Sequence, residues 1–241
     1  MPMRDELIQR AIQQLAITFA RLISRHGAIG SVEAGVLRSE IEALYPAFLG
    51  TSAALLRRLT TEDILGVLRS AGYVDGERAY LLGALFEAEA ELLLAEQEDD
   101  EPNQESTGLR LRALDLILEA GIEELGEPDI PERVERLRSA VAGEPRPAAS
   151  WERLHHYFAA HGSYAKAEDA LFAWLEAIDA AGADTGQVRY LSDVGGSYYR
   201  SLTEVDDEAL EAGGLPRDEV EEGRSSFEES VAVLAGTGTA G

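Results

Sequence analysis

Apolar residues recur at the spacing of an α-helix along most of this chain, and no segment shows the strict alternation that is typical of a β-strand. The first such run extends from Leu7 to Ile23 and ends at His26 and Gly27. Because side chains three and four residues apart share one face of a helix, each run forms a helix with one face to bury. The sequence therefore predicts an all-α fold.

Residues that begin or end helices separate these runs. Ser31 is an expected N-cap, Pro46 helps to end the helix that follows, and Thr60 or Thr61 precedes two acidic residues, which suit the positive end of a helix dipole. Further helices are expected at residues 77–96, 107–125, 131–143, 150–161 and 164–180, then through residues 188–202, before the Gly pair at 213–214, and after residue 215.

Two segments divide the chain. Residues 96–105 contain no apolar side chain and no positive charge, so we expect an acidic loop near 96–106 that is mobile. Pro145, Arg146 and Pro147 form a stiff connector. The expected organisation is a set of helical hairpins over residues 1–145, a second helical part over 146–230, and a flexible tail over 231–241.

Charge and composition limit the partners. The 241 residues carry a net charge of −24, and a polyanion such as nucleic acid usually requires a basic face, so binding to nucleic acid is disfavoured. No run approaches the roughly 18 apolar residues of a membrane span. Cys is absent and no targeting signal is evident, which favours a cytoplasmic protein without disulfides.

The clearest motif is a helical hairpin between Trp151 and Trp174. Leu154 and Phe158 share a helical face with Trp151, Gly162 permits a tight turn, and a small residue in the second helix allows close approach. The full set of spaced positions is Trp151, Leu154, Phe158, Gly162, Tyr164, Ala167, Leu171 and Trp174.

These positions resemble a tetratricopeptide repeat, with one departure, since such repeats normally place a small residue where Trp174 stands. A weaker match starts at Leu82 and resumes after the acidic segment at Ala113. Together with the runs at residues 164–172 and 213–220, the arrangement resembles an uncharacterised family of bacterial tetratricopeptide-like proteins. This resemblance implies antiparallel hairpins stacked into a short right-handed array with extra C-terminal helices, and it implies no activity.

Tetratricopeptide arrays commonly bind peptides along their first helices, so the resemblance implies a binding surface on the first helix of the clear hairpin. Candidate residues there are Glu152, Arg153 and His156, beside Ala159 and Ala160. An Arg and a His in this position suit a carboxylate. The alternative is that all of them are ordinary solvated surface residues.

Aromatic residues concentrate between Trp151 and Tyr199. Trp174, Tyr190, Tyr198 and Tyr199 suit a rigid contact surface for a partner, and Tyr198 and Tyr199 are the candidates kept for binding. The competing interpretation is that most of these side chains pack the C-terminal helices against one another.

Each catalytic or metal-binding pattern in the sequence is incomplete or lacks its structural context. Glu152 and His155 match half of a helical di-iron motif, but the chain contains no second Glu-x-x-His. The G-x-G-x-x-G at residues 236–241 follows no strand, and Ser197 lacks the flanking pattern of a nucleophile elbow. No metal, cofactor or catalytic residue is therefore expected.

The sequence thus predicts a non-enzymatic helical protein that binds a protein or peptide or associates with itself. A helical enzyme or small-ligand binder with a pocket between helices is the alternative. An acidic protein that engages a basic partner is a third possibility, and it depends only on charge.

Overall fold

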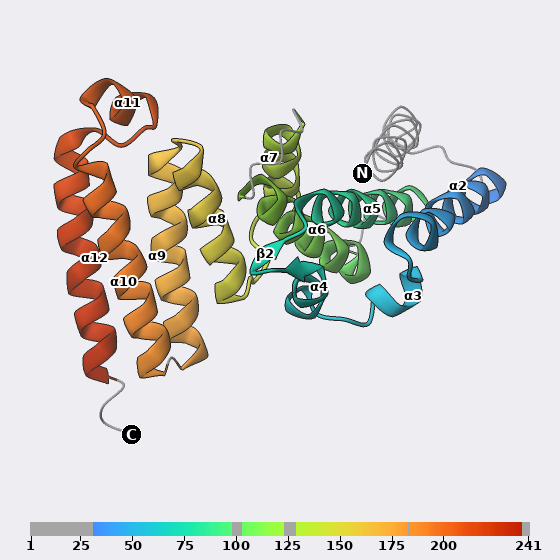
Figure 1. Cartoon of the computed structure of the whole chain (residues 1–241), viewed down its shortest axis with the longest axis horizontal. Helices are drawn as coiled ribbons and strands as arrows, with labels where there is room; N and C mark the ends of the chain where they lie inside the picture. The colour runs from blue at the N-terminus through green and yellow to red at the C-terminus, as the bar shows by residue number, and fades with distance from the viewer. Residues whose placement is uncertain (1–30, 98–102, 123–128, 183, 238–241) are drawn as a thin grey trace. The chain divides into compact units, whose positions relative to one another are not determined.

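The computed structural model describes residues 31–97, 103–122, 129–182 and 184–237 (Figure 1). The predicted first helix, residues 98–102 of the acidic segment and the last residues of the tail lie outside this part. The described chain is built from α-helices with one π-helical turn and one two-stranded ribbon, so the predicted all-α class is confirmed. No helix in these ranges is both long enough and apolar enough to cross a membrane.

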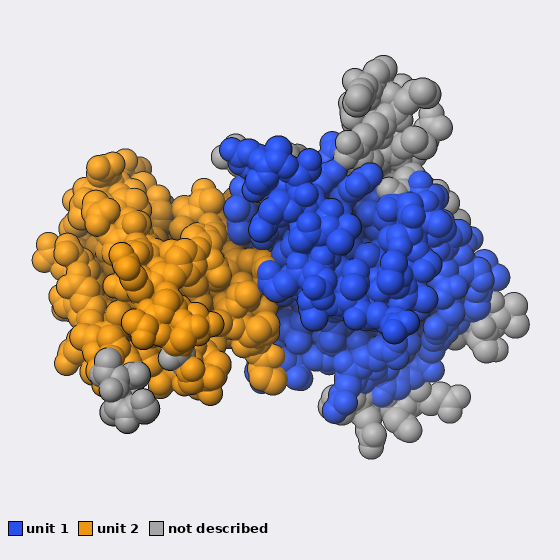
Figure 2. Space-filling model, turned by 60° about the horizontal axis from the view of Figure 1, so that its bottom comes forward, with its two compact units in different colours: residues 1–144 blue, residues 145–241 orange. Residues whose placement is uncertain are grey.

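Contacts divide the chain into two compact units, residues 1–144 and residues 145–241 (Figure 2). Unit 1 contains α2 (Ser31–Leu44), the π-helical turn η1 (Tyr45–Leu49), α3 (Ala53–Leu56), α4 (Thr61–Leu68), β1 (Arg69–Ser70), β2 (Tyr73–Val74), α5 (Gly76–Ala95), α6 (Gln104–Ile122) and α7 (Ile130–Ala140). Unit 2 contains α8 (Ala148–Ala160), α9 (Tyr164–Ala181), α10 (Thr185–Leu202), α11 (Asp207–Ala212) and α12 (Arg217–Thr237).

Helix α5 forms the centre of unit 1. Every residue from Ala79 to Ala90 is buried, as is expected of a helix that is packed on all sides. Helix α6 runs antiparallel to it, and the two approach so closely at Gly83 that an added Cβ would lie 2.9 Å from the side chain of Ile117. At the other end of this pair, the Ser106 hydroxyl donates a hydrogen bond to the Ala90 carbonyl at 3.2 Å.

Two carboxylates are buried along α5, and each is paired with Arg. Glu87 is 1% exposed and accepts hydrogen bonds from Arg133 and Arg136 of α7 at 2.5 to 2.9 Å. Glu89 accepts two hydrogen bonds from Arg57 at 2.7 and 2.9 Å. A buried charge is tolerated when it is paired in this way, so these ion pairs tie α5 to its neighbours.

Unit 2 is organised around two helical hairpins. Gly162, at φ +67°, turns the chain between α8 and α9, and Leu154, Ala167 and Leu171 fill the space between the two helices. In the second pair, α10 packs on α12, and an added Cβ at Gly195 would lie 2.2 Å from the ring of Phe227. The expected helix through residues 188–202 is part of α10, and its stripe of Val188, Leu191, Gly195, Tyr198 and Leu202 is buried.

Three expectations need correction. Residues 69–74 form a short antiparallel ribbon that the sequence did not predict, because two-residue strands are too short to show a period. The acidic loop is shorter than expected, since α6 already begins at Gln104, where Asn103 accepts a hydrogen bond from the Ser106 amide. The flexible tail does not begin at 231, because α12 continues through Thr237 with Val231 and Leu234 buried.

Candidate functional site

An open groove of about 420 Å³ lies in unit 2 between α8 and α10. Both helices contribute side chains to it, and we call it the α8–α10 groove. Its lining consists of His155, His156 and Ala159 from α8 and of Asp193, Val194, Ser197, Tyr198 and Ser201 from α10.

Aromatic contacts and one hydrogen bond hold α10 beside α8. The rings of His155 and Tyr198 meet edge to face at 4.9 Å between centroids. Near the start of α10, the Tyr190 hydroxyl donates a hydrogen bond of 2.8 Å to the carboxylate of Glu152. Burial, together with this carboxylate, raises the pKa of Tyr190 to about 12, so the phenol keeps the proton that it donates. Trp174 packs against Tyr190 at 5.8 Å and supports it from α9.

His155 is fixed in one tautomer at the floor of the groove. It is only 2% exposed, and its Nδ1 lies 2.9 Å from the backbone carbonyl of Ala167. Since a carbonyl oxygen can only accept, Nδ1 must carry the proton and Nε2 must hold a lone pair. Burial lowers the pKa of His155 to about 4, so the ring is neutral at pH 7. Within the described residues, Nε2 has no hydrogen-bond partner.

The two neighbouring tyrosines have internal partners. The Tyr198 hydroxyl donates to the backbone carbonyl of Tyr164 at 2.7 Å, and its ring remains in the groove lining. Tyr199 is 1% exposed and donates to the Glu168 carboxylate at 2.7 Å. Burial raises the pKa of Glu168, while this hydrogen bond opposes the shift. Tyr199 therefore supports the packing of the helices and does not line the groove.

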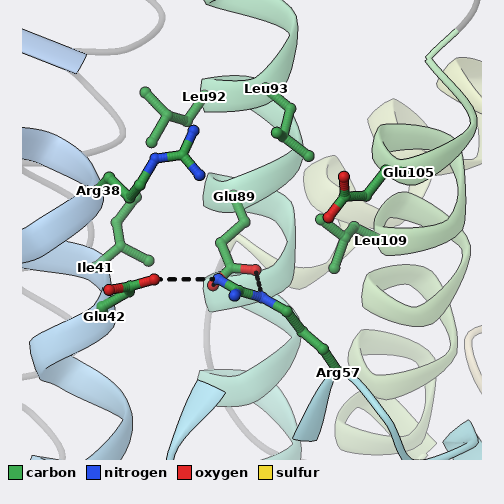
Figure 3. A pocket seen from close by; sticks show the side chains of 9 residues that line it. All are labelled: Arg38, Ile41, Glu42, Arg57, Glu89, Leu92, Leu93, Glu105 and Leu109. Atoms are coloured by element: carbon green, nitrogen blue, oxygen red, sulfur yellow. Dashed lines mark hydrogen bonds and ion pairs between the residues drawn. The ribbon is translucent and has the colours of Figure 1, made fainter. Parts of the chain in front are cut away.

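Unit 1 contains a smaller cavity, between α2, α5 and α6 (Figure 3). Arg57 extends into it, forms an ion pair with Glu89 at 2.7 Å and lies 3.8 Å from a carboxylate oxygen of Glu42. The cavity measures about 40 Å³. Pockets for small organic ligands usually measure about 300–1,000 Å³, so this cavity has room only for a few water molecules. The α8–α10 groove is the larger of these two candidate sites.

Comparison with known proteins places the chain in a family without assigning an activity. Residues 3–231 match a family described as "Family of unknown function (DUF6483)". The chain belongs to this family. No curated protein and no solved structure matches it. The family description mentions no repeat, so the tetratricopeptide-like arrangement stays a prediction, although the two helices of the clear hairpin formed where they were expected.

The groove includes only part of the predicted binding residues. His156, Ala159 and Tyr198 line it, and Glu152 lies beside it as the acceptor of Tyr190. Arg153 is buried, is absent from the lining, and so does not offer its guanidinium to a groove ligand. The aromatic side chains of Trp174, Tyr198 and Tyr199 are buried among the helices of unit 2, as the packing interpretation predicted, whereas Tyr190 is half exposed.

Other lining residues were not proposed as binding residues from the sequence. The sequence pattern indicates His155 only as half of a di-iron motif and Ser197 only as an incomplete nucleophile elbow. Asp193, Ser197 and Ser201 follow one another at four-residue spacing and therefore share a face of α10, which is a signal that the sequence did contain. In the part of the chain that is described, no group of three or more His, Cys, Asp or Glu side chains is arranged to hold a metal ion.

Proposed function

We propose that this protein is a non-enzymatic interaction module whose α8–α10 groove holds an extended segment of a protein partner. The observation that carries this proposal is the groove itself, an open channel of about 420 Å³ with side chains from two helices. An open groove exposes a length of surface along both helices and leaves its ends free for a continuing chain, whereas small-molecule sites usually surround most of their ligand.

The chemistry of the lining supports peptide binding. Val194, Ala159 and the Tyr198 ring offer apolar contact, while Ser197 and two His side chains offer polar atoms. The His155–Tyr198 contact and the Tyr190–Glu152 hydrogen bond join the two helices that form the walls. A preorganised surface loses less entropy when it binds, which favours recognition of a flexible segment.

The resemblance to tetratricopeptide arrays gives the same surface, because α8 would be the first helix of one hairpin and α10 the first helix of the next. A cytoplasmic location and self-association belong to the same proposal. In a self-associating form, the bound segment would come from a second copy of the chain.

The test is selection of groove-dependent peptides. A phage-displayed library of random 12-residue peptides is panned on the full chain, and the enriched peptides are titrated against Ala159→Trp, which fills the groove without adding charge. Ala180→Trp, on the exposed side of α9, is the matched control. We expect Ala159→Trp to weaken binding at least about tenfold and the control to leave it unchanged. Failure to enrich any peptide, or equal binding to both variants, would contradict the proposal.

A further inference from the structure

The polar lining of the α8–α10 groove includes two groups that only accept hydrogen bonds, Nε2 of His155 and the Asp193 carboxylate. Nε2 of His155 presents a lone pair there, because Nδ1 already donates to the Ala167 carbonyl. The Nε2 nitrogen is not among the buried polar atoms that lack a partner, so it is open to solvent in the groove and can accept a hydrogen bond from a ligand in place of water. The groove floor therefore favours a partner that brings an N–H or O–H group.

The charges at the groove also favour a partner that brings hydrogen-bond donors, in this case positively charged ones. The exposed carboxylate of Asp193 lines it, and within the described residues no ion pair engages that side chain. A second carboxylate, Glu152, lies beside His156, with 3.9 Å between its Oε1 and the His156 Nε2. Arg189 and Arg200 are exposed on the same helix as Asp193, but neither contributes to the lining.

The net negative charge of unit 2 acts in the same direction as the carboxylates at the groove. Unit 2 contains seven Lys and Arg residues against eighteen Asp and Glu residues, which gives a net charge of −11. A surface of one sign attracts ligands of the opposite sign and speeds their association. An anionic ligand would meet this field, the Asp193 carboxylate and the lone pair of His155 together.

Building on the proposed groove function, we infer that the partner segment is cationic: a peptide stretch with Lys or Arg whose N–H groups donate to His155 Nε2 and whose charge pairs with Asp193. The long apolar stems of Lys and Arg fit this site as well, since they lie along Val194, Ala159 and the Tyr198 ring while their charged ends stay hydrated. This reverses the sequence hypothesis that Arg153 and His156 meet a carboxylate, because Arg153 is buried away from the lining.

The experiment uses two fluorescein-labelled peptides of ten residues that differ only in charge, one with three Arg among Leu and Gly and one with three Glu in the same positions. Each is titrated with the full chain by fluorescence anisotropy at about 0.15 M salt, where long-range attraction is largely screened. We expect only the Arg peptide to bind.

Two Asp variants separate local pairing from the overall field, because both change the net charge by one. Asp193→Asn alters the groove, and Asp179→Asn alters an exposed position on α9. We expect Asp193→Asn to weaken binding of the Arg peptide about threefold to fivefold and Asp179→Asn to change it by less than about 1.5-fold. A ¹⁵N resonance of His155 Nε2 that shifts on addition of the Arg peptide supports the donor contact and needs no variant.

The outcomes distinguish this inference from the proposed function. Binding of the Glu peptide that Ala159→Trp abolishes would overturn the cationic preference and leave the groove function standing. Equal effects of Asp193→Asn and Asp179→Asn, or an unmoved His155 resonance, would also overturn the cationic preference. If neither peptide binds the wild-type chain, the groove function and the inference are both overturned. The same holds if a peptide that binds the wild-type chain binds Ala159→Trp equally well.

Discussion

Replacement of Gly195 by Ala should destabilise unit 2, whereas the same replacement at the adjacent Gly196 should stabilise it. A Cβ at position 195 would lie 2.2 Å and 2.4 Å from two ring carbons of Phe227, well inside van der Waals contact, and a Cβ at position 196 would have no atom within 4 Å. Phe227 cannot yield easily, because it is 2% exposed and packs against Phe172 at 5.9 Å and Tyr199 at 6.0 Å.

Two effects set the magnitude. Ala is more favourable than Gly in a helix interior by about 1 kcal/mol, and this gain applies equally at both positions of α10. Overpacking of a filled core costs about 1–3 kcal/mol, and this cost applies only at Gly195. The free energy of unfolding should therefore rise by about 0.5–1 kcal/mol for Gly196→Ala. It should be about 1–3 kcal/mol lower in Gly195→Ala than in Gly196→Ala.

Urea denaturation followed by tryptophan fluorescence measures this difference in the correct part of the molecule. The chain has two Trp residues, Trp151 and Trp174, and both lie in unit 2. Comparison of two Ala variants cancels the helix propensity and isolates the packing term. Coincident unfolding midpoints, or a more stable Gly195→Ala, would show that close approach of α12 does not exclude a side chain at position 195.

Three further predictions concern buried or capping groups. Glu87→Ala should lower the free energy of unfolding by about 3–5 kcal/mol, because it leaves two Arg side chains without their buried partner. Circular dichroism during urea denaturation measures this change. Replacement of the exposed Glu132 by Ala is the control and should change the stability little. The free energy of unfolding of unit 2 should fall by roughly 2–3 kcal/mol between pH 7 and pH 4.5 because of His155. The pKa of His155 is about 6.5 in the unfolded chain and about 4 in the folded chain, so the unfolded chain binds the proton first and stability drops as the pH drops. A His155→Phe variant whose stability has the same pH slope would contradict this. Thr60→Ala should lower the free energy of unfolding by about 1 kcal/mol, because it removes the side-chain cap of α4. Thr61 is not the N-cap of this helix, so Thr61→Ala should lower it clearly less in the same urea assay.

Local signals in the sequence located most helices well. Thr60 accepts a hydrogen bond from the Asp63 amide and the Asp63 side chain accepts one in return, so one of the two expected caps of α4 is the observed one. Helix α9 begins at the predicted Tyr164, because Gly162 supplies the left-handed turn before it. Such features depend on residues within a few positions of each other, and a sequence pattern can contain them.

Long-range partners could not be predicted in this way. Nothing near Glu87 in the sequence indicates burial, since the Arg133 and Arg136 that neutralise it lie 46 and 49 positions later. The same holds for the groove. His155 is recognisable as an acceptor only once Ala167 of the next helix fixes its tautomer, and Asp193 belongs to the lining only because α10 packs beside α8.

The carboxylates of the chain therefore occupy two kinds of environment that composition alone does not separate. The chain has 45 acidic and 21 basic side chains. Glu87 and Glu89, which are buried along α5, are paired with Arg, because an unpaired buried charge is costly. Glu87 and Glu89 are neutralised in this way and are unavailable to a partner. Asp193 is exposed, lines a groove and is left without an ion pair in the described part of the chain. Under the proposed groove function, Asp193 is therefore the carboxylate that would pair with a partner, and a Lys or Arg side chain is the group that could engage both Asp193 and the nearby His155 Nε2.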